Sequence, residues 1–119
     1  MLRWVLRGQA IFYVLTGLWP LLSLATFEAV TGPKVDDWLV HMVGLLAATI
    51  GVTLWVGARQ RPPAAAIVLL AVLSAASFAA IDLRYALAGR ISRVYLLDAA
   101  AEVAIILALA AAWRARRDA

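Results

Sequence analysis

The stretch "AAAIVLLAVLSAASFAAIDL", residues 64–83, contains one charged residue, Asp82, close to its end. A helix of about 20 apolar residues is long enough to cross a hydrocarbon core of about 30 Å. On either side of this segment, further apolar runs of similar length cover residues 4–27, 38–58 and 93–113. The sequence therefore predicts an all-α fold, a single-domain bundle of four membrane-spanning helices.

The composition indicates that the membrane is the solvent of this chain. Of the 119 residues, 66% are hydrophobic and 15% are charged, and the mean hydropathy is +0.92. Soluble domains average about 45–50% apolar and about 25% charged residues. We expect residues 4–27 to be a retained span and not a signal peptide, because the run is long and contains Trp19 and Pro20. The absence of cysteine excludes disulfides and thiolate sites.

The distribution of Lys and Arg predicts the orientation. If both termini are cytoplasmic, seven of the 11 basic residues lie on the inner side and four on the outer side. Because positive charge favours the cytoplasmic side, we expect both termini to be cytoplasmic. The +4 net charge then reflects orientation, and no nucleic-acid partner is expected. The inner residues are Arg3, Arg7, Arg59, Arg61, Arg114, Arg116 and Arg117, and the outer ones are Lys34, Arg84, Arg90 and Arg93.

Polar residues are distributed unevenly along this bundle. Six of the seven acids and the single histidine fall in its outer half, whereas only Asp118 lies on the inner side. The inner half is almost entirely apolar. We therefore expect a functional polar layer in the outer half of the bundle. Its candidate ligand-binding residues are Glu102, Asp98, Asp82, His41, Glu28, Tyr95, Tyr85, Trp38, Trp19 and Arg84.

Asp98 and Glu102 are the strongest candidates within this layer. Counting about 1.5 Å per residue from Arg93, Asp98 lies about 7–8 Å inside the span and Glu102 about 13–14 Å inside. A charge near the midplane costs about 2.5–3.5 kcal/mol on insertion scales, so such acids are functional candidates by default. Four residues apart, the two carboxyls share one helix face. We expect them to share a proton that Glu102 holds.

Structural roles compete with functional ones at several of these positions. Asp37 suits the first turn of the span that follows it, where a helix favours an anion. Asp37 and His41 are four residues apart, so a hydrogen bond between them would satisfy the imidazole. Glu28 is expected near a helix C-terminus, where an anion is disfavoured, and should therefore pair with a cation such as Lys34 or an arginine.

Two further alternatives concern the acids of the last two spans. Arg84 or Arg93 could bind Asp82 and Asp98, which would make the acids clamps between helices. A metal site is not expected, because the chain has one histidine and lacks the Glu-x-x-His pattern of bundle di-metal sites. No cofactor is expected either, because no glycine-rich phosphate loop or nucleophile elbow is present.

Three stretches carry a resemblance to known proteins. "GLWPLLSLATFEAVTGPKVDDWLVHMVGLL" (17–46), "IDLRY" (81–85) and "VYLLDAAAE" (94–102) resemble a group of small uncharacterised bacterial four-span membrane proteins, and "FEAVTGPKVDDWLV" is the most specific part. The resemblance implies a multi-pass protein of the bacterial cytoplasmic membrane and no particular activity. The architecture is also similar to DoxX-like proteins and to sterol-isomerase and sigma-receptor-type bundles, which hold ligands between helices beside acidic groups.

Four functions fit these observations. The polar layer could bind a lipophilic or cationic small molecule, with membrane lipids as its other partners. It could be an acid–base enzyme of isomerase, cyclase or epoxide-opening type acting on a lipid-like substrate, with Glu102, Asp98 and His41 as catalytic residues. It could carry protons or small cations, for which a homodimer would complete the path. In an assembly protein, the acids would be structural. We favour ligand binding.

Overall fold

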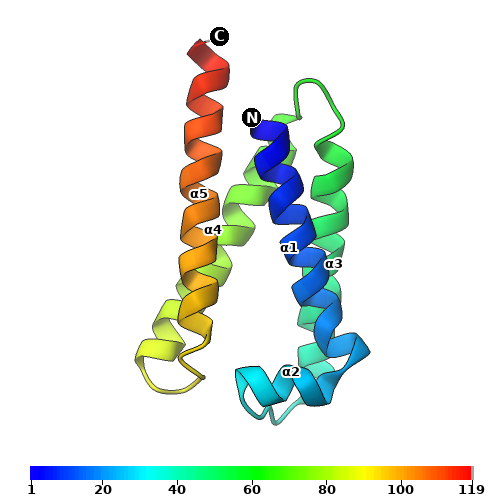
Figure 1. Ribbon diagram of the computed structural model, residues 1–119, viewed down its shortest axis with the longest axis vertical. Coiled ribbons are helices and arrows are strands. Elements are labelled where there is room, and N and C mark those ends of the chain that lie inside the picture. The colour runs from blue at the N-terminus through cyan, green and yellow to red at the C-terminus, as the bar shows by residue number, and fades with distance from the viewer. Residues whose placement is uncertain (119) are drawn as a thin grey trace.

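Five helices make up the part of the chain that the computed structural model describes, namely the backbone of residues 1–118 and the side chains of residues 1–116 (Figure 1). They are α1 (Leu2–Leu22), α2 (Leu24–Thr31), α3 (Asp37–Gly57), α4 (Ala65–Leu87) and α5 (Tyr95–Asp118). All except α2 are long and apolar enough to cross a membrane. The chain is thus an all-α, multi-pass membrane protein, as predicted. The side chains of Arg117 and Asp118, which entered the charge distribution above, lie outside the described residues.

The first apolar run is divided into two helices where the sequence predicts one. α1 ends at Leu22 because Ser23 leaves the helical region, with φ −153° and ψ 87°. The Ser23 hydroxyl then accepts a hydrogen bond from the Thr26 N–H and caps α2, as serine commonly does at a helix N-terminus. Pro20 lies in the last turn of α1 and donates no backbone hydrogen bond there. α2 consequently lies across the end of the bundle (Figure 1).

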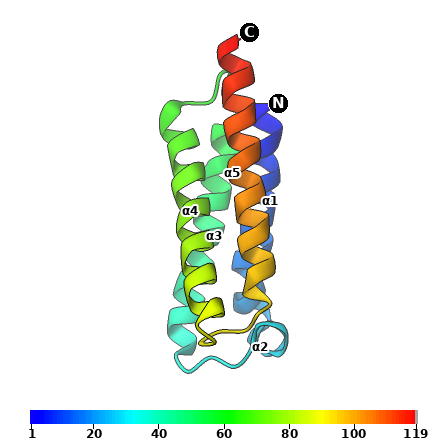
Figure 2. The ribbon, with the colours of Figure 1, turned by 90° about the vertical axis from the view of Figure 1, so that its left-hand side faces the viewer.

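The spanning helices associate as two pairs, α1 with α3 and α4 with α5. The two pairs contact each other less extensively than the helices within each pair do. In the side view of Figure 2, α4 and α5 lie in front of α1 and α3. Glycine allows the closest approach: a Cβ on Gly17 would lie 2.5 Å from the Gly44 carbonyl oxygen and 2.7 Å from the Ala48 nitrogen. Small residues at such crossings are typical of helix packing in lipid.

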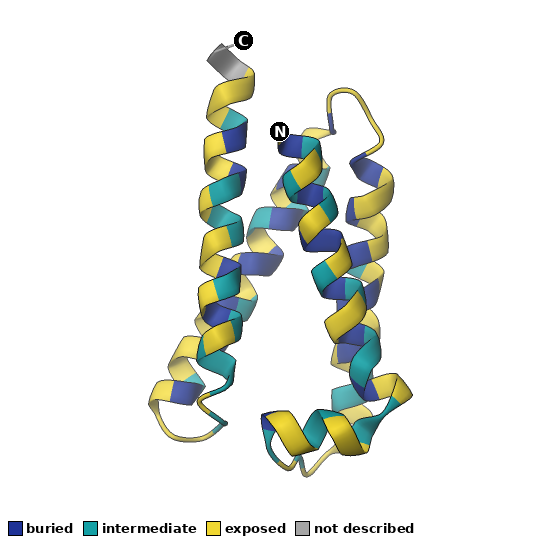
Figure 3. Ribbon diagram, viewed as in Figure 1, coloured by how far each residue is buried: buried dark blue, intermediate teal, exposed yellow. Residues whose placement is uncertain are grey.

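The apolar core occupies the half of the bundle that contains the termini. It consists of Leu2, Leu6, Ala10, Leu54, Ala58, Val68, Ala71, Leu109 and Ala112. Buried residues follow the inner faces of the helices, whereas exposed residues cover the outward faces (Figure 3). Many of the exposed residues are large and apolar, for example Leu15, Leu73 and Leu107. Such faces suit contact with lipid, because a soluble surface rarely exposes so much apolar area.

Both termini lie at the same end of the molecule, and α2 lies at the other end (Figure 1). An even number of spans produces this arrangement. The molecule measures 48 Å along its longest axis, which is sufficient to cross a hydrocarbon core of about 30 Å with its interfaces. The acids of α4 and α5 belong to the half opposite the termini, because Asp82 is near the end of α4 and Asp98 is in the first turn of α5.

Candidate functional site

Three carboxyl groups come together where the end of α4 packs against the beginning of α5. Asp82 on α4 is 6% exposed, and Glu102 on α5 is 1% exposed. Asp98, one turn before Glu102, is partly exposed, and its carboxyl group is a neighbour of the Asp82 carboxyl group. The charges of Asp98 and Glu102 both act on Asp82. The three groups therefore form one interacting cluster, which we call the carboxyl layer (Asp82, Asp98 and Glu102).

A tyrosine from the other helix pair completes this layer. The Tyr13 hydroxyl on α1 donates a hydrogen bond of 2.7 Å to Glu102 Oε2, and the tyrosine side chain is only 1% exposed. The Phe78 ring of α4 packs edge-on against the Tyr13 ring, with centroids 5.4 Å apart. Gln9 and Ser74 lie beside the phenol oxygen. Tyr13 thus links α1 to the acids of α5 through a buried polar contact.

Two buried oxygen atoms in this region have no hydrogen-bond partner among the described residues, Oδ2 of Asp82 and Oε1 of Gln9. The amide nitrogen of Gln9 is satisfied, because it donates to the Ala71 carbonyl oxygen over 2.9 Å. Both unpaired atoms are acceptors. A buried acceptor without a donor costs about 1–3 kcal/mol, so the layer is suited to a group that brings hydrogen-bond donors or positive charge.

The arginines that could clamp these acids do not do so. Arg84 and Arg93 are both exposed, and the Arg84 guanidinium lies 5.7 Å from the centre of the neighbouring Tyr85 ring. Within the described part of the chain, neither arginine pairs with Asp82 or Asp98. In this arrangement, the described residues therefore contain no ion-paired clamp at these acids. No group of three or more His, Asp or Glu residues among those described is placed to hold a metal ion.

Glu28 and His41 occupy other positions. Glu28 lies on α2 with its Oε1 buried and unpaired. The expected partner, Lys34, instead donates to the Thr31 and Gly32 carbonyl oxygens at 3.0 and 2.8 Å and so closes the end of α2. No hydrogen bond joins Asp37 to His41 among the contacts of the described residues. No hydrogen bond among the described residues joins Glu28 or His41 to the carboxyl layer.

The aromatic residues expected to form its walls also have other neighbours. Trp19 donates to the Thr26 hydroxyl at 3.0 Å and packs edge-on against Phe27, so it holds α2 to α1. Trp38 is 63% exposed. The Tyr95 ring lies 5.2 Å from the Lys34 ammonium. The aromatic group in direct contact with an acid is Tyr13.

Tyr13, Gln9 and Ser74 are the polar residues of this site that the sequence did not single out as ligands. A usable signal exists for two of them. Gln9 and Tyr13 are four residues apart in an otherwise apolar run and therefore share one helix face with the buried Leu6. A polar stripe on a spanning helix indicates a partner inside the bundle.

Two hollows of the described surface differ from the carboxyl layer in the residues that line them. An apolar groove runs over α4 and α5 past Leu83, Ala99, Val103 and Leu107, and a second cavity opens at the end that contains the termini. Neither is lined by Asp82, Asp98 or Glu102. Asp98 is the one member of the three that is partly exposed.

Comparisons of the chain with protein-family models, with curated proteins and with solved structures returned no match.

Proposed function

We propose that the carboxyl layer binds the cationic head of a lipophilic small molecule. The observation that carries the proposal is the pair of buried acceptors without donors, Asp82 Oδ2 and Gln9 Oε1, beside three carboxyl groups that no described basic side chain neutralises. An ammonium group supplies both the missing donors and the missing charge. The apolar surroundings of the layer suit an apolar remainder of the same molecule.

The exposure of the three acids indicates the direction of approach. Asp98 is partly exposed, Asp82 is nearly buried, and Glu102 is buried behind the Tyr13 hydrogen bond. A cationic head would meet Asp98 first and then contact Asp82. Glu102, which is buried more deeply, would contribute its negative charge from behind these two acids. The molecule would enter sideways from the lipid, in the half where the two helix pairs diverge (Figure 1).

Proton or small-cation transport is a second candidate, favoured by one specific observation. Gln9 and Ser74 continue the buried polar contacts from Tyr13 toward the end that contains the termini. The other hydroxyls of the spans are unsuited to a path, since Thr49, Thr53 and Ser77 are exposed and donate to carbonyl oxygens of their own helices. A second copy of the chain would have to supply the remaining steps.

The resemblance to bacterial four-span proteins supports placing this protein in the bacterial cytoplasmic membrane. The acid–base enzyme is the weaker proposal, because neither cavity described above brings two of the acids to a space for a reacting carbon. A site that binds a cation needs only the acceptors themselves. Binding is thus the function that requires the fewest features beyond those present.

The test measures binding of dodecylammonium by native mass spectrometry, with dodecanol as a neutral molecule of the same chain length. We expect the wild type to retain the amine at least about tenfold better than the alcohol, because a charge-assisted hydrogen bond contributes about 1.5–3 kcal/mol. Asp82→Asn and Glu102→Gln should lose this preference. Asp36→Asn, which changes an exposed acid, is the matched control.

Equal retention of the amine and the alcohol by the wild type would refute the proposal. Equal loss in Asp36→Asn and Asp82→Asn would refute it as well, because the effect would then follow net charge and not the layer. A discrete co-purified mass that disappears in Glu102→Gln would identify the natural ligand. Proton uptake by proteoliposomes that depends on Glu102 would favour transport instead.

A further inference from the structure

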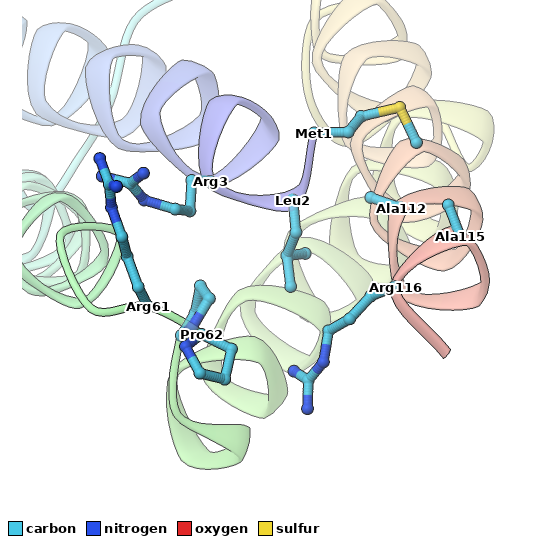
Figure 4. Close-up of a pocket in the computed structure, with 9 residues that line it drawn as sticks. Met1, Leu2, Arg3, Arg61, Pro62, Ala112, Ala115 and Arg116 are labelled. Atoms are coloured by element: carbon cyan, nitrogen blue, oxygen red, sulfur yellow. The ribbon is translucent and has the colours of Figure 1, made fainter. Parts of the chain in front are cut away.

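A cavity of about 540 Å³ opens at the end of the bundle that contains both termini (Figure 4). It lies between the start of α1, the connection from α3 to α4 and the last turns of α5. Its apolar wall is formed by Leu2, Pro62, Pro63, Ala112 and Ala115. The volume falls within the range of about 300–1,000 Å³ that is usual for small-molecule sites.

Three arginines, Arg3, Arg61 and Arg116, supply the polar part of this cavity. Figure 4 shows Arg3 and Arg61 next to each other on one side of the proline turn, and Arg116 on the opposite side. Arg3 donates from Nε to the Ala58 carbonyl oxygen at 2.7 Å. This bond fixes its guanidinium and leaves the two terminal nitrogens available to another acceptor.

The cations of this cavity repel each other. The positive charges of Arg61 and Arg7 both act on Arg3, and none of the lining residues that the structure describes is acidic. The arginines supply this positive potential, because the positive N-terminal ends of α1 and α4 are offset by the negative C-terminal ends of α3 and α5 at the same end of the bundle. An anion would relieve this repulsion, and a phosphate matches the guanidinium fork.

We infer that this cavity binds the phosphate headgroup of an anionic phospholipid. It is located where four spanning helices end, which is the depth of the headgroups in a bilayer. The wall beside the arginines is apolar, which suits the glycerol and upper acyl chain of a lipid and not a free phosphate ion. Basic pockets between spanning helices bind anionic headgroups in this way. The inference is independent of the carboxyl layer.

The experiment counts phosphatidylglycerol molecules retained by the detergent-released protein in native mass spectrometry, with phosphatidylcholine as the zwitterionic comparison. The variant is Arg61→Gln with Arg116→Gln. Both side chains are exposed and make no hydrogen bond among the described residues, so the fold should persist. The matched control is Arg90→Gln with Arg93→Gln, which removes the same charge at the opposite end of the molecule.

We expect the variant to retain the tightest-bound phosphatidylglycerol at least about tenfold less than the wild type, because each interfacial arginine contributes about 1 kcal/mol to anionic-lipid binding. The control should behave as the wild type does. Equal loss in both proteins would overturn the inference, because binding would then follow total charge. Unchanged retention in the variant would overturn it too.

A second measurement uses the wild type alone, so that its result does not depend on the folding of the variant. A photoactivatable phosphatidylglycerol with its reactive group near the glycerol should label peptides that contain Leu2 or Ala112. The phosphatidylcholine analogue should label them much less. Equal labelling by the two lipids would contradict the inference. Displacement of the anionic probe by millimolar inorganic phosphate would show that the site takes a free anion and that the lipid assignment is wrong.

Discussion

The hydrogen bond from Tyr13 to Glu102 joins the carboxyl layer to α1. Both residues are buried, and they come from helices that are far apart in the sequence. If the phenol hydroxyl were removed, Glu102 Oε2 would stay buried and would lose this hydrogen-bond donor. The Tyr13 hydroxyl on α1 therefore stabilises the deepest acid of α5 in its buried position.

Tyr13→Phe should lower the free energy of unfolding in detergent by about 1–3 kcal/mol, the usual cost of an unsatisfied buried polar group. Thermal unfolding of the purified protein measures this change. Tyr85→Phe removes the same atom from a partly exposed ring and is the matched control. The double variant Tyr13→Phe, Glu102→Gln should recover part of the loss. Equal effects of the two single variants would contradict the role assigned to Tyr13.

The helices themselves are held together by different means in the two halves of the chain. α1 and α3 approach closely at Gly17 and Gly44, where a side chain on either glycine would meet the backbone of the other helix. α4 and α5 instead meet through alanine-rich faces that end in the carboxyl layer. The first pair consequently has the more extensive contact.

Gly17→Ala should destabilise the protein by about 1–3 kcal/mol, because the added Cβ would overlap the Gly44 carbonyl oxygen and force the helices apart. Gly8→Ala places the same methyl group on the same helix, where nothing lies within 4 Å. It should be neutral or stabilising by up to about 1 kcal/mol, because alanine favours the helix. Thermal unfolding compares the two variants. Similar losses in both would contradict the close packing of α1 against α3.

Elements were easier to predict from the sequence than contacts between them. The four spans follow from hydropathy and length, which are local properties. The break at Ser23 was not predicted, because the residues around it remain apolar and a cap is marked by one hydroxyl only. Asp98 and Glu102 share a face through helical spacing alone. Their partners Tyr13 and Asp82 depend on how separate helices are rotated, which the sequence of one chain does not specify.

The same limit explains the residues that the structure places elsewhere. The sequence groups His41 and Glu28 with the acids because all of them lie at a similar depth. Depth along a helix says nothing about which way a side chain points. Lys34 was expected to pair with Glu28, but the free carbonyl groups at the end of α2 lie nearer to it and accept its hydrogen bonds.

At the scale of the whole molecule, the four spans place both termini and the connection between α3 and α4 on one side of the membrane. The remaining connections lie on the other side. The excess of arginine predicts that the first side is cytoplasmic. The chain contains no cysteine, so single cysteines introduced into it can report this orientation without background.

Val35→Cys and Gln60→Cys test the orientation, since both side chains are exposed in connections at opposite ends. A membrane-impermeant maleimide applied to intact cells should label the cysteine at position 35 and should label the one at position 60 only after the membrane is opened. The reverse pattern would show that the termini face outward. Labelling of both positions in intact cells would contradict four spans.

The close fit of α1 against α3 has a consequence for how the protein is made. Chains enter the membrane from their N-terminus as they are synthesised, so the two spans that pack most tightly are also the first to arrive. They can assemble while α4 and α5 are still being translated. When Glu102 enters the bilayer, the Tyr13 hydroxyl is already present to donate its hydrogen bond. The buried acid Glu102 is thus inserted with the last span, after its hydrogen-bond partner Tyr13 has already entered the membrane.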